Sequence, residues 1–398
     1  MSLLMTLIEV AAPTVTFPRL RDRLRLRLTV ADKPRVLAEA DRAADIGGIS
    51  PILPREGLRS SAPTDRRRQR PVGRLKAPSP ANFATRTGLG DARNVGEAGL
   101  LPQVLILLAS FNGAAHLREQ LQSLATQQGV VWSLLWRDDG SNDETIAILD
   151  EFATAHPGRV ARLSGGGRLG AGASFMRLLA EAPDAEFYAF MDQDDVWLPG
   201  KLARAIAAMT DNDLVCTRLQ LVAPDLREIA LSPLPSRPPN FATLLAHNVA
   251  AGCTMVLTAR ARSWALAAPM PEGGLHDWWC ALAVTGCGGC LSFDPEPSLL
   301  YRQHSGNLVG GGVGRLDRMR RMLGRGSAGF YAPLVRLMAA LPALPLTQDA
   351  RGVLAALQGL RAGSPFRRLA AVRQAGLAHH ARLGDALLRT WVLLRRMP

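Results

Sequence analysis

An acidic cluster directly behind an apolar run constrains this chain more than any other feature. Residues 187–191 read Phe-Tyr-Ala-Phe-Met, and the next four read Asp-Gln-Asp-Asp. The apolar run predicts a buried strand that delivers Asp192, Asp194 and Asp195 to the sheet edge where open α/β sheets bind ligands. Clustered carboxylates repel one another unless a cation lies between them, and Mg²⁺ prefers one or two carboxylates together with substrate phosphates. The segment therefore predicts a nucleotide-diphosphate site held through a metal, and the alternative is a solvated acidic turn before a helix that begins at Pro199.

Two further polar segments follow predicted strands. A strand over Val104–Leu108 precedes Ala-Ser-Phe-Asn-Gly at 109–113, and a strand over Val131–Arg137 precedes Asp-Asp-Gly-Ser at 138–141. Strands and helices alternate through this region, which predicts a doubly wound, mostly parallel α/β sheet. The carboxyl ends of parallel strands meet at one edge, so all three polar segments can face one crevice.

Charge divides the chain into three parts. Residues 1–100 carry 18 Lys/Arg against 10 Asp/Glu, residues 101–312 carry 14 against 21, and residues 313–398 carry 15 against 3. The first part is rich in Pro, Gly, Ser and Arg, which predicts a disordered basic arm or a mis-assigned start. We expect the second part to hold the α/β domain and the third to be a basic helical extension.

The basic flanks leave two interpretations open for residues 313–398. Their Arg-rich helices either pack on the core with solvated Arg faces, or present a patch that contacts an anionic membrane surface. No apolar run reaches the length of about 18 residues that a membrane-spanning helix requires. Five cysteines, an odd number, indicate reduced thiols and a cytoplasmic setting. Cys287 and Cys290 have the spacing of half a zinc site, and no second pair completes it.

The remaining expectations concern local structure. Residues 141–144 read Ser-Asn-Asp-Glu, which predicts a capping box for the helix that follows. A flexible loop is expected over Gly165–Gly172. Further along the chain we expect strands over Leu214–Val222, Gly252–Thr258 and Leu299–Arg302, and a helix over His276–Val284.

The three polar segments, in this order, resemble family-two glycosyltransferases with the GT-A fold. The resemblance covers about residues 103–312 and is strongest to the rhamnosyltransferase-like branch. It rests on three motifs: Leu-Ala-Ser-Phe-Asn-Gly, Arg-Asp-Asp-Gly-Ser-Asn-Asp and Asp-Gln-Asp-Asp-Val-Trp-Leu-Pro-Gly-Lys-Leu. It implies a Rossmann-like nucleotide half, a mixed acceptor half and, in this chain, a C-terminal helical extension.

The resemblance also implies roles for nucleotide-binding residues. Ala109 and Phe111 would line the nucleobase pocket, and Asp139 would accept a hydrogen bond from the N–H of a pyrimidine. Asp192 would contact the ribose and diphosphate, and Asp194 would be a ligand of Mg²⁺ or Mn²⁺. Turn chemistry is the alternative for the Asp-Asp-Gly segment that contains Asp139.

A second group of residues is expected on the acceptor side. Asp277 lies in a His-Asp-Trp-Trp segment resembling the one that carries the family's catalytic base; the alternative is a helix N-cap or first-turn acid. Trp278 and Trp279 are the candidates for a platform for the acceptor, with one of the two expected in the core. Asp195, Arg302 and His304 would reach the diphosphate, the metal or the acceptor.

The function implied is a metal-dependent, inverting transfer of a sugar, rhamnose among the candidates. The donor would be a UDP- or dTDP-sugar, and the acceptor a polysaccharide or a lipid-linked glycan at the inner face of the membrane. A nucleotidyltransferase, or a non-enzymatic protein that binds nucleic acid through the basic flanks, are the alternatives; no specific nucleic acid is expected. One departure from the family is Arg168, where relatives often have Asn.

Overall fold

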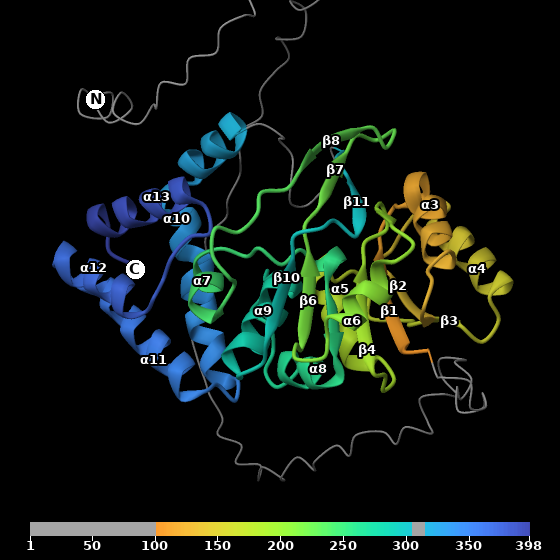
Figure 1. Ribbon diagram of the computed structural model, residues 1–398, viewed down its shortest axis with the longest axis horizontal. Helices are drawn as coiled ribbons and strands as arrows, with labels where there is room; N and C mark the ends of the chain where they lie inside the picture. Colours follow the sequence, from red (N-terminus) through yellow and green to blue (C-terminus); the bar gives the residue numbers. More distant parts are fainter. Residues whose placement is uncertain (1–100, 305–314) are drawn as a thin grey trace, which may run out of the picture. The chain divides into compact units, whose positions relative to one another are not determined.

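The computed structural model describes the backbone of residues 101–304 and 315–398, and the side chains of residues 101–304 and 327–398. This part of the chain contains two sheets. The expectations for residues 1–100 lie outside it. The larger sheet has, in spatial order, β10 (Leu291–Asp294), β6 (Leu214–Thr217), β9 (Val256–Thr258), β4 (Phe187–Met191), β1 (Gln103–Ser110), β2 (Val131–Asp138) and β3 (Val160–Arg162). The smaller sheet has β5 (Val196–Trp197), β11 (Leu299–Arg302), β7 (Gln220–Val222) and β8 (Glu228–Leu231) (Figure 1).

The larger sheet is mostly parallel, as predicted. Strands β4, β1, β2 and β3 run parallel to one another, and β10 runs parallel to β6. Strand β9 is antiparallel to both of its neighbours, so the sheet has a parallel half and a mixed half. This is the α/β, GT-A-type arrangement expected from the sequence.

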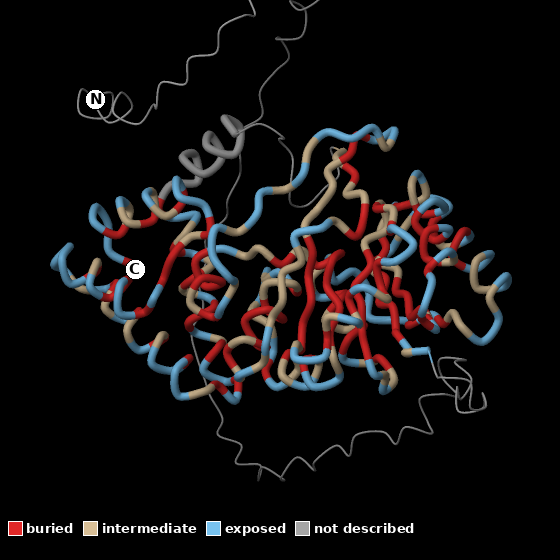
Figure 2. The backbone as a smooth tube through the Cα atoms, in the orientation of Figure 1, coloured by how far each residue is buried: buried red, intermediate tan, exposed pale blue. Residues whose placement is uncertain are grey.

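Helices cover both faces of the larger sheet. They are α3 (Ala114–Ala125), α4 (Thr145–Ala155), α5 (Ala171–Glu181), α6 (Lys201–Ala207), α7 (Phe241–Ala246), α8 (Ala259–Ala265) and α9 (His276–Gly286). Side chains alternate along β1: Val104, Ile106 and Leu108 pack with α3, α4 and α6, whereas Leu105 and Leu107 pack with α5, α8 and α9. The central strands are therefore buried on both faces, as Figure 2 shows.

The C-terminal helices share the core of the sheet. They are α10 (Arg315–Ala340), α11 (Gln348–Leu357), α12 (Pro365–Gln374) and α13 (Arg382–Leu394). Leu337 of α10 and Leu354 of α11 belong to the same buried cluster as Trp279 of α9. None of the described helices combines the length and the apolarity that crossing a bilayer requires.

A buried arginine joins the start of α12 to the end of α13. Arg368 is 5% exposed and donates hydrogen bonds to the carbonyl oxygens of Val392 and Leu393. This junction leaves two large apolar side chains in solvent, Phe366 at 81% exposure and Leu394 at 74%.

Three local expectations were wrong. Leu214–Val222 forms two strands rather than one, because the chain leaves the larger sheet after Thr217 and pairs with β8 and β11 from Gln220 onward. Gly252–Thr258 begins with a 3₁₀ turn, η1 (Gly252–Thr254), before β9 starts at Val256.

The third wrong expectation is the capping box before α4, which the described residues 141–145 do not form. Ser141 donates to Asp138 instead, and the first helical N–H, from Thr145, donates to the side chain of Asp143. All five cysteines are free thiols. Cys287 and Cys290 belong to no described group of side chains close enough to share a metal ion.

Candidate active site

Three strand ends bring the predicted motifs to one edge of the sheet. Strand β1 lies between β4 and β2, so the segments that follow these strands are neighbours in space. Gln193 links two of them: its Oε1 accepts from the N–H of Phe111 at 2.8 Å, and its Nε2 donates to the carbonyl of Phe111 at 2.9 Å. A Cβ at Gly113 would lie 2.3 Å from Gln193 Oε1, so this contact requires glycine there.

Gln193 was not predicted as a site residue. It lies between two aspartates, which are more common ligands and catalytic groups than glutamine. Nothing in the local sequence indicates that its side-chain amide forms hydrogen bonds with the loop after β1.

Asp138 shapes the turn after β2. Its Oδ2 accepts from the N–H groups of Gly140 and Ser141 at 2.8 and 2.7 Å, and Ser141 Oγ donates to its Oδ1. The turn-chemistry interpretation therefore describes Asp138 well.

Asp139 holds a loop and a buried arginine. Its two oxygens accept from the N–H groups of Leu169 and Gly170, at 2.6 and 2.8 Å, and it pairs with Arg137 at 2.7 Å. Arg137 is 1% exposed and also donates to Ser174. Burial opposes ionisation of Asp139, but the hydrogen bonds from the loop and from Arg137 outweigh it and hold its pKa below the usual range. A residue expected to bind the nucleobase is thus also an anchor of the loop after β3.

The same loop lies over the other predicted nucleobase residue. The guanidinium of Arg168 lies 4.2 Å from the centre of the Phe111 ring, a cation–π contact. Ala109, at the end of β1, is half-buried and packs against the core. Arg168, Phe111 and Asp139 therefore surround one place at the carboxyl ends of β1 and β2.

Asp194 meets a histidine from the far end of the domain. His304 Nε2 lies 2.8 Å from Asp194 Oδ2, and both side chains are partly accessible. Arg302, which is 2% exposed, supports this arrangement by donating to the carbonyl of Asp194 and to the Glu119 carboxylate. The structure brings together Asp194, Arg302 and His304, as predicted, and adds Glu119, which was not.

A second acidic group lies deeper. One carboxylate oxygen of Asp192, one of Asp195 and the Sγ of Cys253 all lie within 4.8 Å of one another. Burial and the nearby carboxylates raise the pKa of the Cys253 thiol well above its usual value, so it stays protonated. A protonated soft thiol is a poor ligand for a hard cation, and the main-chain N–H of Arg302 already approaches Asp195. The accessible oxygen and nitrogen of Asp194 and His304 are chemically better suited to such a cation.

Asp277 lies in the first turn of α9, close to this cluster. Its carboxylate accepts from the N–H groups of Trp278 at 2.6 Å and Gly252 at 3.2 Å. Burial raises its pKa to about 6, and burial with the nearby Asp194 and Asp277 carboxylates raises that of Asp192 to about 7. A Cβ at Gly252 would lie 2.6 Å from His276 Nε2 and 3.4 Å from Asp277, so glycine permits the close approach of η1 to α9.

The residues around Asp277 divide into core and surface. Trp279 is 1% exposed and bonds the Ala265 carbonyl, so it belongs to the core. His276 packs between Phe175 and Phe190, and burial lowers its pKa to about 3, so it is neutral. Trp278 is half-buried, and its Nε1 donates to the Leu244 carbonyl at 2.7 Å. Only Trp278 of the two indoles is placed to meet a ligand.

Comparison with known proteins identifies the family. Residues 105–258, which contain β1, β2, β4 and the segments at their ends, match the family model "Glycosyl transferase family 2". These residues form a family-two glycosyltransferase domain. The predicted family is confirmed for residues 105–258, and the protein carries a glycosyltransferase domain.

Two bacterial glycosyltransferases are among the proteins to which this chain is similar. The dTDP-rhamnosyl transferase RfbG of Shigella flexneri is 26% identical over 226 residues, which is 54% of this chain and 78% of the relative. The UDP-Glc:alpha-D-GlcNAc-diphosphoundecaprenol beta-1,3-glucosyltransferase WfgD of Escherichia coli is 31% identical over 111 residues, 28% of this chain and 42% of the relative. The first of these confirms the rhamnosyltransferase-like resemblance.

Solved structures of other glycosyltransferases are also similar. Residues 1–349 of S. aureus TarS with UDP-GlcNAc are 14% identical and cover 72% of this chain and 85% of that one, with a TM-score of 0.47. The mannosyltransferase PcManGT of Pyrobaculum calidifontis with GDP-Man and Mn²⁺ is 17% identical and covers 79% and 85%, with a TM-score of 0.42. Both scores lie below 0.5, and the assignment rests on the family match.

Proposed function

We propose that this glycosyltransferase is metal-dependent and inverting, and that it moves a sugar from a UDP- or dTDP-sugar to a polysaccharide or lipid-linked acceptor. One observation carries the proposal: Asp277, in the first turn of α9, accepts from the Gly252 N–H, and the Sγ of the next residue, Cys253, lies within 4.8 Å of carboxylate oxygens of Asp192 and Asp195. A basic carboxylate for the acceptor thus stands beside the groups suited to the donor diphosphate.

Asp277 would act as the general base. Its carboxylate takes the proton of an acceptor hydroxyl while that oxygen attacks the anomeric carbon, and the bond from this carbon to the diphosphate oxygen breaks. Attack opposite the leaving diphosphate inverts the anomeric centre. A pKa of about 6 keeps the group largely ionised at neutral pH and makes it a stronger base than an ordinary aspartate.

Asp194 and His304 would hold Mg²⁺ or Mn²⁺. A carboxylate oxygen and an imidazole nitrogen 2.8 Å apart, both partly accessible, suit such an ion. The ion would neutralise charge on the departing diphosphate. Arg302 would orient this pair through its bond to the Asp194 carbonyl, and Glu119 in turn holds Arg302. Phe111, Arg168 and Asp139 would enclose the pyrimidine.

The donor sugar, the domain bounds and the membrane contact are each proposed on a different observation. Similarity to a dTDP-rhamnosyl transferase favours a dTDP-sugar, and rhamnose in particular. We assign the catalytic domain to residues 101–312 and treat 313–398 as its basic extension. The exposed Phe366 and Leu394, which flank the Arg368 junction, favour peripheral attachment of this extension to the inner face of an anionic membrane.

Hydrolysis of a panel of nucleotide sugars, with Mn²⁺, with Mg²⁺ and with a chelator, tests the proposal. We expect hydrolysis of one dTDP- or UDP-sugar that depends on the metal and releases the inverted sugar. Equal hydrolysis in the chelator would remove the metal from the proposal. Preference for a purine nucleotide would remove the pyrimidine site.

A further inference from the structure

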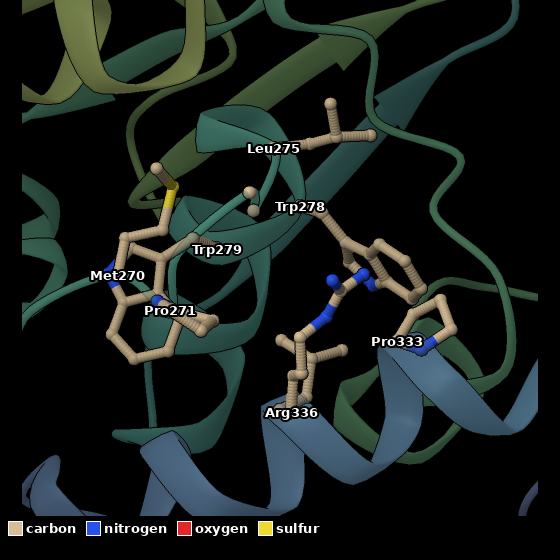
Figure 3. Close-up of a pocket in the computed structure, with 10 residues that line it drawn as sticks. Met270, Pro271, Leu275, Trp278, Trp279, Pro333 and Arg336 are labelled. Atoms are coloured by element: carbon tan, nitrogen blue, oxygen red, sulfur yellow. The ribbon is translucent and has the colours of Figure 1, made fainter. Parts of the chain in front are cut away.

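A cavity of about 160 Å³ lies between the loop before α9 and helix α10. Its walls are mostly apolar, and among its lining residues are Met270, Leu275, Trp278, Pro333 and Leu337. Figure 3 shows the Trp278 indole and the Pro333 ring on one side and Met270 on the other. The Trp278 hydrogen bond to Leu244 holds the indole in this position.

One charged side chain lines the cavity. Arg336 rises from α10 with its guanidinium beside the Trp278 indole (Figure 3). Among the described residues it has no hydrogen-bond or ion-pair partner. Glu272, in the loop before α9, is exposed and does not line the cavity. A guanidinium without a counter-charge beside an apolar cavity suits the acidic group of a ligand.

The volume sets the size of the apolar group that would enter. An apolar cavity of about 150 Å³ is large enough to bind benzene. The present cavity therefore accommodates a branched unit of about five carbons, with an attached anion facing Arg336.

The cavity shares a helical turn with the candidate base. Leu275 and Trp278 line it, and Asp277 lies between them in the chain. The Trp278 N–H donates to Asp277 Oδ1 at 2.6 Å. A ligand seated against Trp278 is thus bound beside the residue that would deprotonate an acceptor hydroxyl.

We infer that this cavity is an acceptor subsite that takes the first isoprenoid unit of a prenyl phosphate or diphosphate, with the phosphate on Arg336. The inference rests on the proposed function, because it names the acceptor of the same reaction. It assigns the lipid end of the acceptor to Trp278 and Arg336, and leaves the sugar end to Asp277.

Binding of soluble prenyl probes to the full chain tests the subsite without requiring transfer. Geranyl diphosphate, inorganic pyrophosphate and geraniol are titrated by calorimetry in a chelator, so that a metal-bridged donor site contributes nothing. We expect geranyl diphosphate to bind most tightly, and Arg336→Gln to weaken it by at least about tenfold, as for loss of a charge-assisted hydrogen bond. The matched control is Arg351→Gln, an exposed arginine on α11 outside the cavity, which should bind as the wild type does.

Three results would overturn the inference. They are unchanged binding by Arg336→Gln, equal affinity for pyrophosphate and geranyl diphosphate, and displacement of geranyl diphosphate by UDP in the chelator. Failure of the nucleotide-sugar panel with these three tests passed would overturn the proposed reaction and leave the prenyl site in place.

Discussion

His304 and Asp194 stand 110 residues apart in the sequence, yet His304 Nε2 lies 2.8 Å from Asp194 Oδ2. The contact joins the end of the acidic segment after β4 to the segment after β11. It places one imidazole nitrogen and one carboxylate oxygen at the same point of the crevice, each in a segment that follows a strand of a different sheet.

Replacing either partner should abolish the effect of metal on nucleotide binding. We expect Asp194→Asn and His304→Ala to lose the gain in UDP or dTDP affinity that Mn²⁺ gives the wild type, and to keep their affinity for the free nucleoside. Calorimetric titrations with and without Mn²⁺ measure both. Asp211→Asn, an exposed acid outside the site, is the control. A full metal effect in both variants would place the ion elsewhere, with Asp192 and Asp195 the next candidates.

Asp277→Asn should separate catalysis from structure. The amide oxygen can still accept from the Trp278 N–H, and only the longer bond from Gly252 is lost, so the fold and donor binding should persist. Turnover should fall by about 10²–10⁴, because general-base catalysis is lost. Single-turnover transfer measures the chemical step directly. A near-normal rate would instead support the helix-start interpretation, since Asn also serves well at helix N-termini.

The kcat/KM of the wild type should depend on pH through the ionisation of Asp277. The pKa of Asp277 is raised to about 6, and only the ionised form accepts a proton. We therefore expect kcat/KM to fall as the pH drops through about 6, by about tenfold for each further unit. A profile that stays flat down to pH 4.5 or so would contradict a base with this pKa.

Asp139→Ala should affect stability as well as nucleotide binding. The substitution leaves Arg137 buried without its carboxylate, which costs about 3–5 kcal/mol where no other partner compensates. The remaining bonds to Ser174 and to the Gly167 carbonyl reduce this toward the lower figure. Urea denaturation gives the free energy of unfolding.

A double variant separates the two roles of Asp139. Arg137→Met/Asp139→Ala removes the unpaired charge, so it should recover part of the lost stability. It should still bind pyrimidine nucleoside weakly if Asp139 contacts the base. Recovery of nucleoside affinity together with stability would mean that Asp139 acts only by holding the loop.

Phe366→Ser/Leu394→Ser should release the protein from anionic membranes. Both side chains are largely exposed beside the Arg368 junction, with exposed Arg367 and Arg395 near them in the chain. We expect sedimentation with vesicles containing an anionic lipid to fall at least about tenfold, and wild-type binding to weaken as salt screens the arginines.

Leu231→Ser, on the exposed strand β8, is the matched control for this pair. Equal binding to purely zwitterionic vesicles would contradict an electrostatic contribution. Retention of full binding by the double variant would move the membrane contact away from the α12–α13 junction.

The sequence was informative where chemistry is local. Strand β4 and the acidic segment after it could be predicted from the local sequence. Five consecutive apolar residues followed by carboxylates are typical of a buried strand that ends at a polar site. The order of the polar segments along β1, β2 and β4 predicted their common edge. By contrast, the break between β6 and β7 depends on which sheet each half pairs with, and the local sequence does not specify that pairing.

Long-range pairing accounts for most of what was missed. Nothing near Glu119 indicates that it meets Arg302, 183 residues later. The double role of Asp139 was equally hidden, because its loop partners donate through main-chain N–H groups that carry no residue signature. The sequence therefore predicted the positions of the site residues better than their hydrogen-bond and ion-pair partners.

The amide of Gln193 has a practical consequence for altering donor choice. It is bonded in both directions to the main chain of Phe111, so it cannot turn without losing both bonds. The wall expected for the nucleobase and the carboxylates after β4 are consequently tied together. A substitution made at Phe111 or Gly113 to admit a larger base would displace the carboxylates with it, so redesign of this enzyme has to rebuild both loops as one unit.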